Sequence, residues 1–238
     1  MRKLALFFLL ACSLAFSKPS NAVLVDTLRV GVAGETLPAG VWRAKSAKAP
    51  VYVWFHGGMT SGRCDKGLEA GKGFFEIAQS AGNDFVVVSP SACKDRHWVS
   101  ASIYSVDAVL DSLEKKLSRK IAAVSLVGVS DGCLGVMAYS LVGKRNVEKR
   151  VLVSGYLANV WRAEDLAREP RLQGSWDFLQ GASDRLYPSE LTYPWIEAFC
   201  QNQGVNCTKH FDAAGEHDWS YWTEKRKDWI LEFIRNKN

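Results

Sequence analysis

Short apolar segments alternate with segments of helical periodicity along most of this 238-residue chain. Residues 51–55 and 85–89 are continuous apolar runs that end at Gly57 and at Pro90, as expected for strands buried on both faces. Residues 105–117 instead carry apolar side chains at the spacing of one helix face. This alternation predicts an α/β fold with a mainly parallel central sheet and helices on both of its faces.

The same reasoning locates the other elements. The expected strands are an opening hairpin (23–32 with a second run through 41–42), 51–55, 85–89, 123–129, 151–154, 176–179 and 208–211. The expected helices are 66–81, 105–117, 131–142, 191–200 and 220–234. No repeat or linker divides the chain, so residues 23–238 are expected to form one domain. The irregular stretch 158–174 is too short for a large lid and predicts at most a small flap.

A GxSxG sequence, Gly128 to Gly132, lies between an expected buried strand and an expected helix. A sharp strand-to-helix turn of this kind exposes the hydroxyl of its central residue, Ser130, above the sheet. Larger side chains two positions before and after the serine would collide with neighbouring backbone. The pentapeptide alone is a weak signal, but its place between strand and helix indicates a nucleophile.

A serine nucleophile needs a base and a carboxylate that orients the base. The chain has four histidines, and His217 lies in a loop of small residues between the last strand and the last helix. Asp184 lies in a turn that follows another strand. We therefore expect Ser130 as nucleophile, His217 as base and Asp184 as the orienting acid, with Asp212 and Asp218 as less favoured carboxylates.

Backbone N–H groups must stabilise the oxyanion that develops in acyl transfer. One candidate is the N–H of Asp131, directly after the serine. The other should come from the glycine-rich loop after residue 55, where Gly58 is favoured and Met59 is next.

These residues resemble the α/β-hydrolase superfamily and, within it, the phospholipase/carboxylesterase group that includes acyl-protein thioesterases. The narrower likeness depends on FHGG at 55–58, VLVSGYL at 151–157 and GASDRLYP at 181–188. It implies an α/β-hydrolase fold with little or no lid, and acyl-enzyme chemistry on an ester or thioester. The chain departs from the group in having Asp131 where glutamine is usual. Secreted enzymes that resemble polyhydroxybutyrate depolymerases or feruloyl esterases are alternative relatives of this chain.

The chain has nine tryptophans, which is many for its length. Trp98 and Trp161 fall in loops at the expected active-site end, so either is a candidate for substrate binding. Other tryptophans fit the buried face of the last helix.

The N-terminus has the pattern of a secretory signal peptide over residues 1–22. Arg2 and Lys3 precede an apolar run over 4–16, and small residues end at Ala22. The predicted location is therefore periplasmic or secreted. Leu9 to Cys12 also resembles a bacterial lipobox, and membrane association is expected only if Cys12 is lipidated.

Export permits disulfides. The pairing that we favour is Cys200 with Cys207, which closes a short loop, and Cys64 with Cys93, which joins two loops at the active-site end. Cys133 is then left as a buried free thiol. No CxxC pair or HExxH motif occurs, so neither a metal nor another cofactor is expected.

Removal of residues 1–22 lowers the formal charge from +5 to about +2, which gives no reason to expect a nucleic-acid partner. The expected partner is a small-molecule or lipid ester substrate. We prefer an esterase or thioesterase to a serine peptidase of the same fold, because the chain has little room for the extra domain that such peptidases usually carry. A non-catalytic binding module is the third hypothesis.

Overall fold

A computed structural model describes residues 26–32, 35–43, 46, 48–82, 84–95 and 97–235. The predicted signal peptide and the lipobox cysteine lie outside these residues and remain predictions. None of the described helices is long and apolar enough to cross a membrane.

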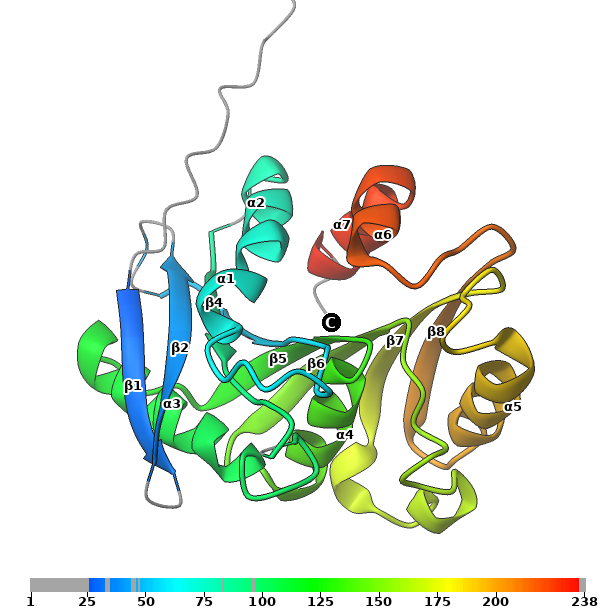
Figure 1. Cartoon of the computed structure of the whole chain (residues 1–238), viewed down its shortest axis with the longest axis horizontal. Helices are drawn as coiled ribbons and strands as arrows, with labels where there is room; N and C mark the ends of the chain where they lie inside the picture. Colours follow the sequence, from blue (N-terminus) through cyan, green and yellow to red (C-terminus); the bar gives the residue numbers. More distant parts are fainter. Residues whose placement is uncertain are drawn as a thin grey trace, which may run out of the picture.

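The centre of the structure is an eight-stranded sheet with the order β1-β2-β4-β3-β5-β6-β7-β8 (Figure 1). β2 pairs antiparallel with β1 and with β4, and every later pairing is parallel. The strand bounds are β1 Asp26–Val32, β2 Glu35–Arg43, β3 Val51–Phe55, β4 Val86–Pro90, β5 Ala123–Val129, β6 Asn146–Val153, β7 Gly174–Gly181 and β8 Val205–Asp212. The predicted mainly parallel sheet and its opening hairpin are confirmed.

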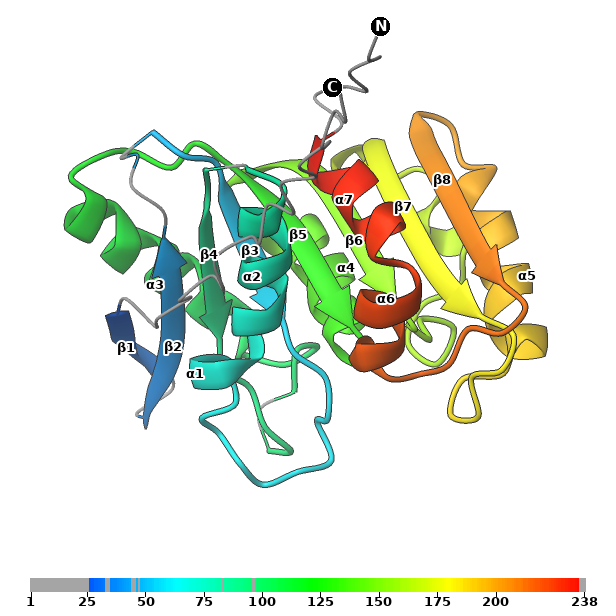
Figure 2. The same ribbon diagram turned by 90° about the horizontal axis from the view of Figure 1, so that it is seen from above.

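Helices cover both faces of the sheet (Figures 1 and 2). One face carries α1 (Gly67–Ala70), α2 (Lys72–Ser80), α6 (Trp219–Lys225) and α7 (Lys227–Arg235). The other carries α3 (Ile103–Leu117), α4 (Gly132–Val142) and α5 (Ser189–Cys200). β3 and β4 are buried along their whole length, as their continuous apolar sequences predicted.

Two helices that the sequence predicted as continuous are divided in the structure. The first breaks at Gly71, where an added Cβ would lie 2.6 Å from the Trp42 ring, so the backbone passes directly over the sheet. The closing helix breaks at Arg226, whose guanidinium donates to Asp212 at the end of β8. In both cases the break coincides with a contact to the sheet, which helical periodicity does not record.

Residues 158–174 form two short 3₁₀ helices, Glu164–Leu166 and Pro170–Leu172. The indole N–H of Trp195 on α5 donates to the carbonyl of Trp161 at 2.7 Å. The amide of Asn202, just after α5, donates to the carbonyl of Ala163 at 3.1 Å. The stretch considered as a small flap is therefore tied to α5.

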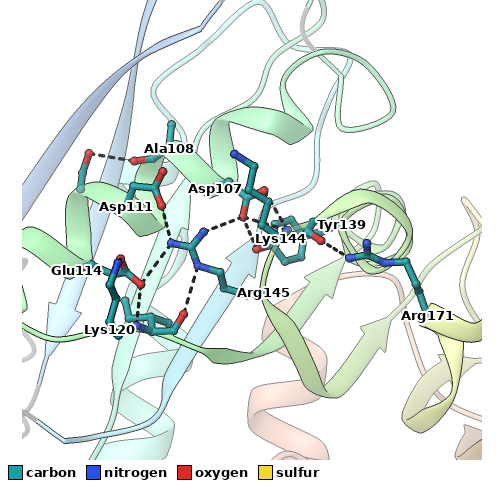
Figure 3. A network of polar contacts seen from close by, with 12 residues as sticks. Asp107, Ala108, Asp111, Glu114, Lys120, Tyr139, Lys144, Arg145 and Arg171 are labelled. Carbon is teal, nitrogen blue, oxygen red and sulfur yellow. Dashed lines mark hydrogen bonds and ion pairs between the residues drawn. The ribbon is translucent and has the colours of Figure 1, made fainter.

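A buried carboxylate joins α3 to the end of α4 (Figure 3). Asp107 accepts from the Tyr139 hydroxyl at 2.8 Å and from the backbone N–H of Lys144 at 3.1 Å. Arg145 lies 3.5 Å from this carboxylate and 2.5 Å from that of Asp111, one helical turn further along α3. The side chain of Asp107 is 6% exposed, whereas that of Asp111 is 53% exposed.

The two aspartates should differ sharply in their contribution to stability. Asp107→Ala leaves a hydroxyl and a backbone N–H without their acceptor in the protein interior, so we expect a loss of about 3 kcal/mol in the free energy of unfolding. The matched variant Asp111→Ala removes an exposed partner of the same arginine and should cost less than about 1 kcal/mol. Urea unfolding followed by circular dichroism measures both, and equal losses would contradict the assignment.

Candidate active site

The three residues expected to act together come from three loops at one edge of the sheet. Ser130 follows β5, Asp184 follows β7, and His217 lies between β8 and α6. β5, β7 and β8 belong to the parallel part of the sheet, so their carboxyl ends meet at this edge (Figure 2).

The turn at Ser130 is the sharp strand-to-helix turn that the sequence predicted, and its backbone is strained. Ser130 has φ +55°, in the left-handed region that a side chain disfavours. Its N–H donates to the carbonyl of Val153 on β6 at 2.9 Å. A Cβ at Gly128 would collide with the carbonyl of Gly132, and one at Gly132 would collide with the carbonyl of Phe55. Glycine at both places therefore lets α4 start directly against β3 and β5.

A chain of hydrogen bonds connects the three side chains. The Ser130 hydroxyl lies 2.9 Å from His217 Nε2, and His217 Nδ1 lies 2.8 Å from Asp184 Oδ2. Asp184 Oδ1 accepts from the backbone N–H groups of Leu186 and Tyr187, each at 2.9 Å. With the proton on Nδ1, His217 can accept the serine proton at Nε2, and the fully buried Asp184 side chain fixes that tautomer.

The loop that carries His217 is anchored to its surroundings. Ser154 has φ +51°, and its hydroxyl donates to the carbonyl of Glu216 at 3.3 Å while accepting from the Trp222 indole at 3.0 Å. Asp212, at the start of the loop, accepts from Tyr221 and Arg226 on the other side. The imidazole is therefore positioned by β6, β8 and α6 together.

The loop after β3 lies directly against the serine. A Cβ at Gly57 would lie 2.9 Å from that of Ser130, and Gly58 has φ +73°. The N–H of Met59 donates to Asp131 Oδ2 at 2.9 Å. Among the described residues, the N–H groups of Gly58 and Asp131 have no acceptor. Of the three expected oxyanion donors, these two are thus open to a ligand, and Met59 is engaged.

Two tyrosines that the sequence analysis did not single out line the site. The Tyr187 ring contacts that of His217 edge-on, with centroids 5.0 Å apart, and its hydroxyl donates to Asp131 Oδ1 at 3.0 Å. The Tyr156 ring lies 5.7 Å from that of Tyr187. Tyr156 lies in the VLVSGYL segment and Tyr187 in the GASDRLYP segment. Their presence in these two segments was the sequence feature that could have indicated them.

The two tryptophans proposed for substrate binding differ in their exposure. Trp98 is fully buried, donates its indole N–H to the carbonyl of His56 at 2.9 Å, and packs edge-on against Phe55. It presents no surface to a substrate, so the expected role does not fit this placement. Trp161 is half-buried beside α5, where its carbonyl accepts from Trp195.

Both expected disulfides are present. Cys64 pairs with Cys93, which joins the loop after β3 to the loop after β4, and Cys200 pairs with Cys207 between α5 and β8. Cys133 is free and buried behind Ser130. Burial raises the pKa of its thiol, which donates to the carbonyls of Gly128 and Val153.

The strand order and the Ser130 turn define an α/β-hydrolase fold. No protein-family model matches the sequence, and no curated protein matches it. The structure is similar to that of a ferulic acid esterase at 19% identity and a TM-score of 0.66, over 88% of this chain and 96% of the other. It is also similar to the esterase PE8 at 18% identity and a TM-score of 0.64, over 82% and 96% of the two chains. An S-formylglutathione hydrolase from Agrobacterium tumefaciens gives 13% identity and a TM-score of 0.66, over 88% and 94%. At these identities the likeness establishes the fold.

His56 gives a testable pH dependence. It is 4% exposed, its Nδ1 lies 2.9 Å from the carbonyl of Gly57, and its Nε2 accepts from the N–H of Ala92 at 3.1 Å. Burial lowers its pKa from 6.5 to about 4, although the bond to Gly57 opposes that shift. The unfolded chain therefore takes up this proton at higher pH than the folded protein does. The stabilisation is complete above pH 6.5 and is lost as the pH falls towards about 4.

Between about pH 7.5 and pH 5, this difference should cost about 2 kcal/mol of unfolding free energy. Urea unfolding at the two pH values measures it. His56→Gln has no titrating group at this position and should lose less stability over the same range, whereas the loop variant His97→Gln should behave as the wild type does. An equal pH dependence in all three proteins would disprove the assignment.

Proposed function

We propose that the protein is a serine hydrolase that cleaves a carboxylic ester or thioester through an acyl-enzyme on Ser130. The observation that carries this proposal is the hydrogen-bonded chain from the Ser130 hydroxyl through His217 to a buried Asp184, on a left-handed turn beside two open N–H groups. The esterases among the structures of the same fold support the reaction class.

In the first half of the proposed reaction, Ser130 Oγ attacks the substrate carbonyl carbon while His217 Nε2 takes the hydroxyl proton. The carbonyl oxygen becomes an oxyanion and accepts from the N–H groups of Gly58 and Asp131. When the C–O or C–S bond breaks, His217 gives its proton to the leaving alcohol or thiol. A water molecule then repeats the sequence on the acyl-enzyme, releasing the acid and regenerating Ser130.

The proposed setting is the periplasm or the extracellular space. The two disulfides support export, because such bonds form and persist in oxidising compartments. The proposed partner is a small-molecule or lipid ester rather than a nucleic acid. Attachment to a membrane is proposed only for a form that is lipidated at Cys12.

Hydrolysis of p-nitrophenyl acetate, butyrate, octanoate and palmitate by residues 23–238 tests the proposal. Ser130→Ala should lower kcat/KM by at least about a thousandfold, because the covalent step has no nucleophile. A fluorophosphonate should label the wild type at Ser130 and leave the variant unlabelled. The melting temperature of the variant, measured by circular dichroism, checks that its fold is intact.

Activity that survives in Ser130→Ala would refute the acyl-enzyme. A wild type that neither turns over these esters nor reacts with the fluorophosphonate would favour a non-catalytic binding module. Turnover of matched p-nitroanilide amides at rates comparable to the esters would favour the serine peptidase.

A further inference from the structure

The residue after the nucleophile carries a carboxylate that joins two loops of the site. Asp131 Oδ2 accepts from the N–H of Met59 in the loop after β3, and Oδ1 accepts from the hydroxyl of Tyr187 in the loop after β7. Burial raises the pKa of Tyr187, and the charge of Asp131 adds to that effect. The tyrosine hydroxyl therefore stays protonated and keeps its role as donor.

A cation contacts the other end of the peptide group that joins Gly58 to Met59. The Lys66 ammonium donates to the carbonyl of Gly58, which is also the acceptor for the N–H of Ser61 at 3.2 Å. The carbonyl of Gly58 and the N–H of Met59 belong to one trans peptide unit, so they point in opposite directions. Lys66 and Asp131, which carry opposite charges, thus form hydrogen bonds to the two ends of this peptide.

The position of this peptide restricts the neighbouring 57–58 peptide, which carries the Gly58 N–H. Gly58 has φ +73°, a conformation that glycine adopts without steric cost but does not hold by itself. The Gly58 N–H belongs to the adjacent 57–58 peptide, and the two peptides meet at the Cα of Gly58. A 58–59 peptide that is held at both ends keeps this Cα in place and so limits how the Gly58 N–H, one of the two open donors beside Ser130, can turn. A preorganised donor is effective because it does not reorient during the reaction.

From this geometry we infer that the side chains of Asp131 and Lys66 are positioning residues that hold the 58–59 peptide and so aim the Gly58 N–H at the substrate oxyanion. This inference rests on the proposed serine hydrolase function. It gives Asp131 a second role, through its side chain, besides the one proposed for its backbone N–H.

The first test compares Asp131→Ala with Asp131→Asn. Alanine removes the acceptor for Met59, and kcat for p-nitrophenyl acetate should fall by about 10- to 100-fold with KM changed less than about threefold. Loss of a whole oxyanion donor costs more than this range. Asparagine keeps an amide oxygen that can accept from Met59, so its kcat should stay at or above about a third of the wild-type value. A role in folding alone would not separate kcat from KM in this way.

The second test compares two cations of the same loop. Lys66→Met should lower kcat by about 10-fold, again with little change in KM, because the 58–59 peptide loses one of its two charged contacts. Arg63→Met removes a cation that pairs with Asp65 and whose side chain is 57% exposed, and it should leave kcat unchanged. In the double variant with Asp131→Ala, the two losses should combine to less than their product, since both act on one peptide.

The rate constant for fluorophosphonate labelling is measured on every variant and should fall with kcat. Wild-type kcat in both Asp131 variants, or an equal loss in the two, would overturn the positioning role while leaving a labelled, active wild type and the proposed function intact. Equal kcat in Lys66→Met and Arg63→Met would overturn the part assigned to Lys66. A wild type that neither labels nor turns over would instead remove the proposed function, and this inference with it.

Discussion

The close packing of the turn at Ser130 against the end of β3 is the constraint on which the site depends. Gly132 can contact the Phe55 carbonyl only because it has no side chain, and this contact lets α4 begin immediately after the serine. The serine is held in a left-handed conformation by its N–H bond to Val153 and by the burial of α4. The strained conformation of Ser130 can persist because the surrounding sheet and helix are among the most buried parts of the molecule.

Every loop that reaches this turn is tied to a neighbour by a bond that does not involve the serine. Ser154 holds the loop of His217, and Ser183 ties the loop of Asp184 to that of His217 by donating to the carbonyls of Gly215 and Ala213. His56 joins the loop after β3 to the loop after β4, and the Cys64–Cys93 disulfide joins the same two loops further out. The site is therefore built on loops, but its geometry is set by rigid elements.

The sequence predicted the strands and the three interacting side chains well, because both depend on local patterns. Continuous apolar runs marked β3 and β5, and the chain order of Ser130, Asp184 and His217 followed the strands that precede them. It did not predict what depends on contacts between distant segments. The helix breaks at Gly71, where the backbone passes close to the Trp42 ring, and Trp98 is buried against Phe55. Nor did the sequence predict the position of Tyr187, whose contact with His217 no local pattern encodes.

Under the proposed function, the negative charge of an aspartate beside the oxyanion would oppose catalysis, because two negative charges repel each other. In this structure the carboxylate of Asp131 accepts from the N–H of Met59 and the hydroxyl of Tyr187, and the charge of Lys66 is close enough to act on it. Two donors and a nearby cation therefore act against its negative charge. By the inferred positioning role, the same contacts would hold the loop that binds the oxyanion, so an acidic residue can serve at this position.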